Sequence, residues 1–189
     1  MVRAFIGIEL DNSLKSDLKE QLRALRKSFP NLKWVDSKNY HLTLRFLGEV
    51  NNETITELKS IINNSAKGIN AIKATINQLG AFPHPDHPRV IWLGLGRGKK
   101  EMVELHSSLE ADIQKLGFSG ERHSYTPHLT IARLKKRSSP EDSLKKTIKN
   151  YNWKERELVI DNITLFKSRL RPSGPIYSLL HQAKILKNP

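Results

Sequence analysis

The chain has 189 residues, with 32 lysines and arginines against 19 aspartates and glutamates, and no cysteine. The absence of cysteine excludes disulfides, thiol catalysis and cysteine-ligated metal sites. The formal charge of +13 favours a polyanionic partner such as nucleic acid, because each neutralised phosphate releases counterions, although a solvated basic surface would have the same composition. Glu9 and Asp11 interrupt the first apolar run, and no stretch is apolar enough to span a membrane. We therefore expect a cytoplasmic protein with no membrane partner.

Hydrophobic periodicity and turn residues divide the chain into strands and helices. The first half contains, in order, a strand at 2–10, a helix from Asn12-Ser13 to about 28, a strand at 40–47 closed by Gly48, a helix from Asn51 or Asn52, and a strand near 72–77. The second half contains a loop at 80–89, a strand at 90–95, a helix at 99–116 ended by Gly117, a strand at 127–134, a helix begun by Ser139-Pro140-Glu141-Asp142, and strands at 156–166 and 176–185. The order strand–helix–strand–helix–strand runs twice. This repeat predicts one α+β domain over residues 1–189, built from two similar halves related by a pseudo-two-fold.

The best local match between the halves is a His-x-Thr-x motif, which occurs once in each. His41-Leu42-Thr43-Leu44 lies in the first half and His128-Leu129-Thr130-Ile131 in the second, both inside expected strands. Because strand side chains alternate, the His and Thr of each motif share one face and the aliphatic residues point into a core. Each motif therefore presents an imidazole beside a hydroxyl. Two unrelated strands with polar solvent faces are the alternative.

Two imidazoles and two hydroxyls around one phosphorus atom fit the opening of a cyclic phosphodiester. That reaction needs a base to deprotonate water and an acid to protonate the leaving oxygen, on opposite sides of phosphorus. Histidine titrates at about pH 6.5, so a neutral His and a protonated His can coexist near neutrality. Thr43 and Thr130 would bind the non-bridging oxygens, where charge develops in the transition state. No metal or other cofactor is then required.

These motifs resemble those of the 2H phosphoesterase superfamily, and more closely those of the RNA 2′,3′-cyclic phosphodiesterases, also called 2′-5′ RNA ligases. The likeness spans nearly the whole chain and includes Arg3-Ala-Phe-Ile-Gly-Ile-Glu-Leu, Trp34-Val35, Tyr40 through Val50, Gly80-Ala-Phe-Pro, Pro88-Arg-Val-Ile-Trp and Tyr125-Thr-Pro-His-Leu-Thr-Ile-Ala-Arg. The resemblance implies a bilobal α+β fold, with an antiparallel sheet in each lobe, helices on the outer faces and an active-site cleft between the lobes.

The same resemblance assigns roles that the residues alone leave open. It implies that His41 is the proton donor and His128 the proton acceptor. It implies that a terminal 2′,3′-cyclic phosphate on RNA becomes a 2′-phosphomonoester, with a weak, reversible, ATP-independent 2′-5′ ligation as a side activity. RNA ends are then the partner, and we expect a monomer without an obligate protein partner.

Two arginines are candidate substrate-binding residues. Arg45 follows Thr43 by two residues, so alternation places it on the face of the motif, where it contacts phosphate or sugar or is merely exposed. Arg133 ends the second motif, and the resemblance favours a substrate contact there. Strict alternation turns Arg133 off that face, so a twist or a strand end is required. The basic run from Arg133 through Lys135, Lys136 and Arg137 either holds the RNA backbone or is a solvated loop.

The remaining aromatic and histidine residues leave alternatives open. Phe46 and Trp92 either stack on a base or belong to the core, and Tyr125 either lines the cleft or belongs to the core. The run His84-Pro-Asp-His-Pro is interpreted as a rigid turn rather than a metal site, and His106, His123 and His181 as structural or surface residues. Two other functions also remain: a 2H phosphoesterase that acts on a small cyclic nucleotide or a 2′-5′ linkage, and a non-catalytic RNA- or nucleotide-binding module.

Overall fold

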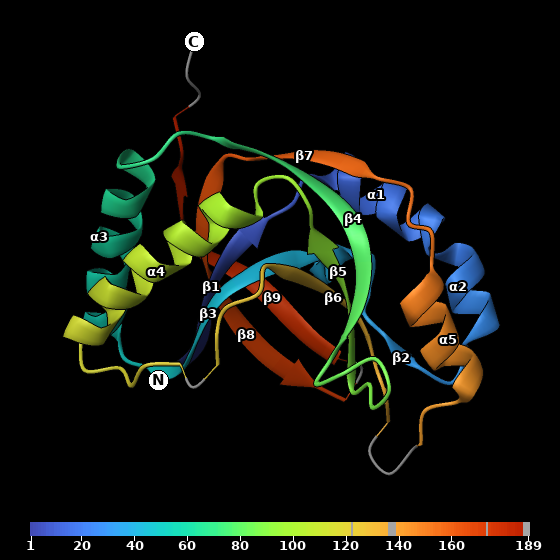
Figure 1. Ribbon diagram of the computed structural model, residues 1–189. Coiled ribbons are helices and arrows are strands. Elements are labelled where there is room, and N and C mark those ends of the chain that lie inside the picture. The colour runs from blue at the N-terminus through green and yellow to red at the C-terminus, as the bar shows by residue number, and fades with distance from the viewer. Residues whose placement is uncertain (122, 136–138, 173, 187–189) are drawn as a thin grey trace.

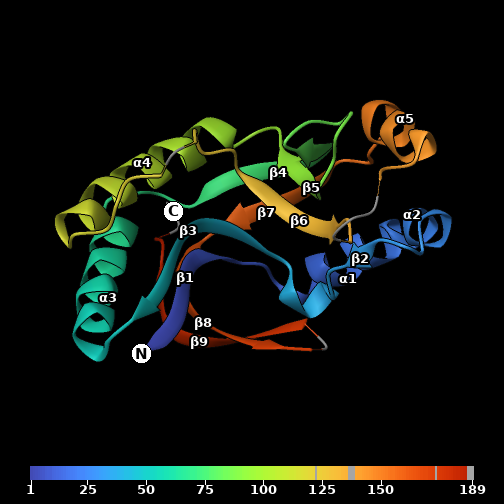
Figure 2. The ribbon, with the colours of Figure 1, turned by 90° about the horizontal axis from the view of Figure 1, so that it is seen from below.

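The computed structural model describes residues 1–121, 123–135, 139–172 and 174–186. It is an α+β protein with two antiparallel sheets (Figures 1 and 2). The first sheet has the strand order β3-β1-β8-β9, and its strands are β1 (Val2–Glu9), β3 (His41–Val50), β8 (Asn162–Arg171) and β9 (Gly174–Lys184). The second sheet has the order β2-β6-β5-β4-β7, and its strands are β2 (Lys33–Trp34), β4 (Ile72–Phe82), β5 (Val90–Leu95), β6 (His128–Arg133) and β7 (Arg156–Ile160).

The helices lie in two groups on opposite sides of the sheets. They are α1 (Asn12–Gln21), α2 (Arg23–Ser28), α3 (Asn52–Lys67), α4 (Lys99–Lys115) and α5 (Asp142–Asn150), with a short 3₁₀ helix, η1 (Ser37–Asn39). Figure 1 shows α3 and α4 on one side and α1, α2 and α5 on the other. α3 packs on β8 and β9, α4 contacts β3, and α5 packs on β4. None of the helices that the structure describes has the length and apolarity needed to cross a membrane.

Each sheet carries one His-x-Thr strand, but neither sheet is built from consecutive residues. The first sheet combines β1 and β3, near the N-terminus, with β8 and β9, near the C-terminus. The middle of the chain supplies most of the second sheet. The two sheets therefore do not correspond to successive halves of the chain: β8 and β9 join the first sheet, and β2 joins the second.

The first strand forms the centre of the first sheet, which explains its continuous apolar run. Ala4, Ile6 and Ile8 are fully buried and belong to the hydrophobic core. On the opposite face, Phe5 pairs with Phe46 and Gly7 pairs with Thr43 of β3. Because both faces of β1 are covered, an apolar residue is favourable at almost every position.

Several boundaries differ from the expected ones. Asp11, not Asn12-Ser13, caps α1, because its side chain accepts a hydrogen bond from the Leu14 amide at 2.7 Å. The helix expected to run to Ser28 is interrupted at Leu22, between α1 and α2. β4 continues to Phe82, so the expected loop begins later.

The expected strand at 156–166 is two strands in different sheets. It divides at Asp161, where the chain leaves β7 for β8. β7 alternates between exposed and buried residues, whereas residues 162–166 of β8 are all buried, and neither pattern shows with which strands each part pairs. Periodicity alone therefore does not reveal it.

Candidate active site

The two motif strands meet where the sheets approach one another. β3 forms an edge of the first sheet and β6 lies inside the second, yet the two strands contact each other. The Tyr125 hydroxyl, three residues before His128, donates a hydrogen bond to the carbonyl of Thr43 at 3.1 Å. The segment that precedes the second motif is thus hydrogen-bonded directly to the first motif.

Both imidazoles are anchored in the same way. The Nδ1–H of His41 donates to the carbonyl of Asn39 at 2.7 Å, and the Nδ1–H of His128 donates to the carbonyl of Thr126 at 2.7 Å. In each case the acceptor lies two residues upstream. Because a carbonyl only accepts, Nδ1 carries the proton and Nε2 is the basic nitrogen of each neutral ring.

The two Nε2 atoms differ in their surroundings. The hydroxyl of Thr43 lies 3.0 Å from Nε2 of His41 and can donate to it. Within the described residues, Nε2 of His128 has no hydrogen-bond partner, although Thr130 lies on the same face of its strand. His128 therefore presents a free basic nitrogen, whereas His41 is engaged by its neighbouring threonine.

Burial favours the neutral form of both rings. Together with the positive charges of His128, Lys15 and Arg133, burial, the largest cause, lowers the pKa of His41 from 6.5 to about 4. Burial and the charge of Arg133 also lower the pKa of His128. The hydrogen bonds to the backbone oppose this effect at both rings. The positive charge of Arg133 thus acts on both imidazoles.

Both motifs contain a β-bulge at their fourth residue. In β3, Gly7 pairs with Thr43 and Ile6 with Arg45, so Leu44 is the extra residue. In β6, Trp92 pairs with Thr130 and Ile91 with Ala132, so Ile131 is the extra residue. A bulge shifts the alternation by one residue. The fifth position of each motif therefore turns away from the His–Thr face, and the sixth position returns to it.

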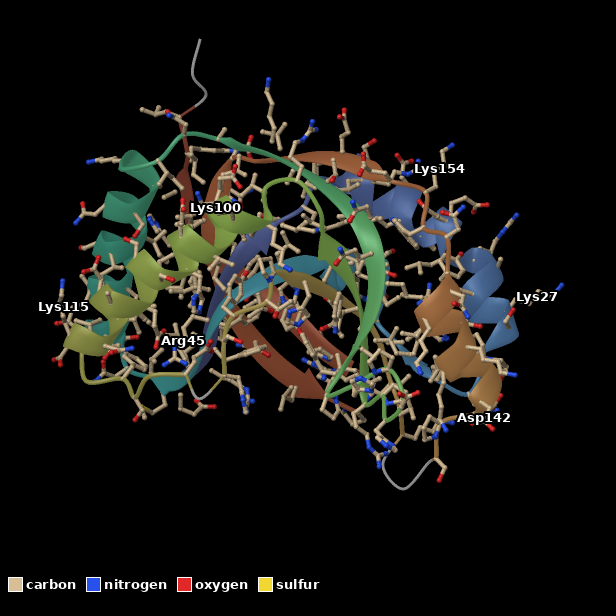
Figure 3. All side chains as sticks on the ribbon, viewed as in Figure 1. Lys27, Arg45, Lys100, Lys115, Asp142 and Lys154 are labelled. Atoms are coloured by element: carbon tan, nitrogen blue, oxygen red, sulfur yellow. The ribbon has the colours of Figure 1, made fainter. Side chains whose placement is uncertain are left out.

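This shift turns Arg45 away from the face on which alternation would place it. Its side chain is only 11% exposed, and its Nε lies 2.8 Å from a carboxylate oxygen of Glu110 in α4. Its Nη1 lies 3.1 Å from Glu121, and its guanidinium also donates to the carbonyl of Ser119. Figure 3 shows Arg45 beside the connection that follows α4. Arg45 thus ties this connection to β3.

The bulge in β6 supplies the departure from strict alternation that the expected position of Arg133 requires. Arg133 occupies the sixth position, pairs with Val90 and is exposed. Its charge lowers the pKa of His41 and of His128, so its guanidinium acts on both rings. Among the described residues Arg133 has no acidic partner, in contrast to Arg45. Lys136 and Arg137, expected to extend the basic run, lie outside the described residues.

Aromatic side chains surround both imidazoles, and most of them were not predicted as site residues. The ring centroids of Phe5 and Tyr177 lie 4.8 and 5.2 Å from that of His41. Phe82 lies 4.9 Å from His128, edge to face. Phe82 belongs to the Gly80-Ala-Phe-Pro segment of the family likeness, which could have indicated it. Nothing in the sequence indicates Tyr177, because its place depends on the pairing of β9 with β8 and of β8 with β1.

The other candidate residues divide between the site and the scaffold. Trp92 is half-buried on the His128 side, and its ring lies across Gly80 and Gly94, where any Cβ would overlap it. Tyr125 belongs to the scaffold, because its ring stacks on that of His106 at 4.1 Å and burial raises its pKa.

The remaining histidines lie outside the site. In the Pro-rich loop, Asp86 contacts His84 at 3.3 Å and Lys149 of α5 at 2.5 Å. His181 bonds to Asn63 at 2.8 Å. No group of three or more potential metal ligands occurs in the part of the chain that the structure describes.

Two antiparallel sheets, each presenting one bulged His-x-Thr strand to the other, define a bilobal class of two-histidine proteins. The chain belongs to the 2′-5′ RNA ligase superfamily, which it matches over residues 14–171.

Relatives with curated names cover almost the whole chain. A Methanocaldococcus jannaschii protein named RNA 2′,3′-cyclic phosphodiesterase is 34% identical over 184 residues, which are 96% of this chain and 99% of that protein. A Thermotoga maritima protein of the same name is 31% identical over 183 residues, 97% of this chain and 95% of that protein.

Solved structures share the fold. A Thermus thermophilus crystal structure matches with a TM-score of 0.77 at 24% identity, covering 99% of this chain and 100% of its own. The structure of Escherichia coli LigT complexed with 3′-AMP matches with a TM-score of 0.74 at 22% identity, covering 98% of this chain and 99% of its own.

Proposed function

We propose that this protein hydrolyses the terminal 2′,3′-cyclic phosphate of RNA to a 2′-phosphomonoester, without a metal ion. The observation that carries the proposal is the matched anchoring of two histidines on neighbouring strands. Each ring is fixed through Nδ1 and keeps Nε2 for chemistry, and each lies in the electrostatic field of Arg133. The names of the relatives support the same activity.

In the proposed reaction, water attacks phosphorus opposite the 3′ oxygen of the ribose. Nε2 of His128 takes a proton from the water as the new P–O bond forms. The P–O3′ bond breaks, and protonated His41 gives its Nε2 proton to the leaving O3′. The phosphate remains on O2′. The free Nε2 of His128 supports its role as the base.

The threonines and Arg133 would stabilise the phosphate. The hydroxyl of Thr43 lies at Nε2 of His41, where a non-bridging phosphate oxygen would meet it. Thr130 has the equivalent place beside His128. The exposed guanidinium of Arg133 supplies the positive charge that a phosphorane-like transition state requires.

His41 must gain a proton before it can act as an acid, since its pKa in the free protein is about 4. The cyclic phosphate carries a negative charge, and an anion next to an imidazole raises the pKa of the ring. Binding of the substrate would therefore favour uptake of a proton by His41 from solvent, and the reaction uses this proton. Both imidazoles would then be neutral in the free protein, and His41 would be an imidazolium in the complex with substrate.

Ligation follows from the same arrangement. If the 5′ hydroxyl of a second RNA replaces the water at His128, the product is a 2′-5′ phosphodiester, and reversal regenerates the cyclic phosphate. No ATP is consumed, because the cyclic ester is opened. A single chain supplies both histidines and both threonines, so we propose that a monomer suffices.

The alternatives are a small cyclic nucleotide or a 2′-5′ linkage as substrate, and binding without catalysis. The charge of +13 favours polymeric RNA. Incubation with EDTA and an RNA oligomer that ends in a 2′,3′-cyclic phosphate tests all three. The proposal predicts a 2′-phosphate end. Turnover of mononucleotides or 2′-5′ oligomers alone, or binding without turnover, would contradict it.

A further inference from the structure

The carbonyl that anchors His41 belongs to a short turn that needs support from outside itself. Asn39 is the last residue of η1, which consists of three residues only. A single 3₁₀ turn is marginal in isolation, and its last carbonyls have no partner within the turn. The Nδ1–H of His41 donates to the carbonyl of Asn39 at 2.7 Å. The direction of the imidazole therefore depends on the contacts that hold η1 in place.

The turn is held at both ends and from the side. At its start, the side chain of Asp36 accepts a hydrogen bond from the Lys38 amide at 3.1 Å. At its end, Tyr40 is 1% exposed and is packed into the hydrophobic core. From the side, the side-chain amide of Asn39 donates to the carbonyl of Pro175 at 2.9 Å. This last bond originates from the same residue whose carbonyl anchors the imidazole.

The bond between Asn39 and Pro175 joins two segments that strand pairing does not hold together. Asn39 precedes β3 and Pro175 lies at the start of β9, and these strands are the opposite edges of the first sheet. Tyr177 follows Pro175 by two residues, and its ring centroid lies 5.2 Å from that of His41. The side chain of Asn39 thus fixes both the carbonyl that orients His41 and the strand that carries the aromatic neighbour of His41.

A fixed acceptor matters for a general acid in two ways. Proton transfer needs about 2.6–3.2 Å between Nε2 and the leaving oxygen, and Nε2 lies across the ring from Nδ1, so a tilt at the anchor displaces it. The hydrogen bond to the carbonyl also stabilises the imidazolium, because it raises the pKa of His41 against the effect of burial. A carbonyl that moves would therefore aim the proton less often and hold it less firmly.

We propose that Asn39 is a positioning residue for the general acid: its side-chain amide clamps η1 to β9 and so holds the carbonyl that orients His41. The inference rests on the proposed function and adds to it a residue that acts through His41. Its effect is confined to the acid, because His128 is anchored separately, by the carbonyl of Thr126.

The test compares a substrate that needs the acid with one that does not. Both are RNA oligomers with a terminal 2′,3′-cyclic phosphate, and in one of them sulfur replaces the bridging O3′, so that the leaving group departs as a thiolate without a proton. Single-turnover rates are measured, at increasing enzyme concentration, for the full-length wild type and for Asn39→Leu, Asn39→Ala and Asn63→Leu. Asn63 is a matched control, because it also bonds to β9, through His181 at 2.8 Å, but outside the site.

With normal RNA, both Asn39 variants lower the maximal rate about five- to tenfold, the factor expected for the loss of one neutral hydrogen bond. The enzyme concentration at half-maximal rate stays unchanged. With the thio substrate, both variants react as fast as the wild type, and Asn63→Leu matches the wild type on both substrates. Equal slowing on the two substrates, a higher half-maximal concentration alone, or an unchanged rate on normal RNA would overturn the proposal.

A spectroscopic measurement separates this inference from the proposed function. NMR of protein labelled with ¹⁵N in histidine reports the tautomer of each neutral ring at pH 7. Asn39→Leu should move His41 from the Nδ1–H form toward a mixture of tautomers and should leave His128 unchanged. If the wild type opens no cyclic phosphate, the proposed function fails, yet the positioning of His41 by Asn39 is still supported by this shift. An unchanged His41 ring in Asn39→Leu refutes it.

Discussion

At the scale of single residues, the neutral state of the histidines links the site to stability. The pKa of His41 is about 4 in the folded protein, against 6.5 when unperturbed. As the pH falls below 6.5, the unfolded chain takes up this proton first, so stability is fully present above 6.5 and is lost toward pH 4. The lowered pKa of His128 adds a loss of the same sign.

We therefore predict that wild-type protein loses about 3 kcal/mol more unfolding free energy than His41→Asn between pH 7 and pH 4, at about 1.4 kcal/mol for each pKa unit. Urea unfolding at the two pH values measures the difference, and titration of the carboxylates cancels between the two proteins. An identical pH dependence in both would show that His41 is not held neutral by the fold.

Arg133 provides a second prediction at this scale. Arg133→Gln removes the exposed cation near both rings and leaves the strand intact. We expect kcat/KM for cyclic-phosphate RNA to fall about 10- to 100-fold, the range for one charge-assisted contact to a phosphate, and the pKa of both histidines to rise. NMR titration of the imidazoles tests the second effect. Unchanged histidine pKa values in Arg133→Gln would place the guanidinium away from the site.

At the scale of elements, the connection after α4 is bonded to the first motif strand through Arg45 and Tyr125. Arg45→Met removes the cation beside the buried carboxylate of Glu110, which keeps only its hydrogen bonds from the side chain of Gln114 and the amide of Glu121. We predict a loss of about 3–5 kcal/mol in unfolding free energy, and a partial recovery when Glu110→Gln is added. Chemical denaturation of the single and double variants measures both. A double variant as unstable as the sum of the two single variants would contradict the ion pair.

The motifs could be predicted from the sequence, because alternation fixes which residues share a face as long as a strand is regular. That reasoning places His41 beside Thr43, whose hydroxyl lies 3.0 Å from its Nε2, and it predicts the same neighbourhood for His128 and Thr130. It failed at Arg45, because a bulge depends on the pairing with the neighbouring strand and leaves no mark in the hydrophobic pattern. The equivalent bulge in β6 returns Arg133 to the His128 face, where strict alternation would not place it.

At the scale of the whole molecule, the class of fold was predictable and the composition of each sheet was not. Repeated strand–helix order indicates two α+β lobes, but β1 pairs with β8, which lies more than 150 residues away in the chain. Local periodicity contains no information on such pairings. Tyr177 therefore reached the site through long-range contacts that the sequence does not display.

The net charge gives a prediction at the same scale. Lys27 and Lys115 lie at opposite edges of the molecule in Figure 3, on α2 and α4. If polymeric RNA is the substrate, its KM rises steeply with salt, with a logarithmic slope of about 0.7 for each phosphate contacted. The KM of a cyclic mononucleotide should rise with salt only with the slope expected for about one phosphate contact. Equal slopes for an octamer and a mononucleotide would favour the small-nucleotide alternative.

The central claim is that the two histidines flank one phosphorus atom and have opposite roles. With normal cyclic-phosphate RNA, His41→Ala and His128→Ala should each slow the chemical step by about two to four powers of ten. A substrate in which sulfur replaces the 3′ bridging oxygen has a leaving group that needs no proton. Single-turnover rates on this substrate should return nearly to wild type in His41→Ala and stay low in His128→Ala. Rescue of His128→Ala, or equal rates for both variants, would contradict the account.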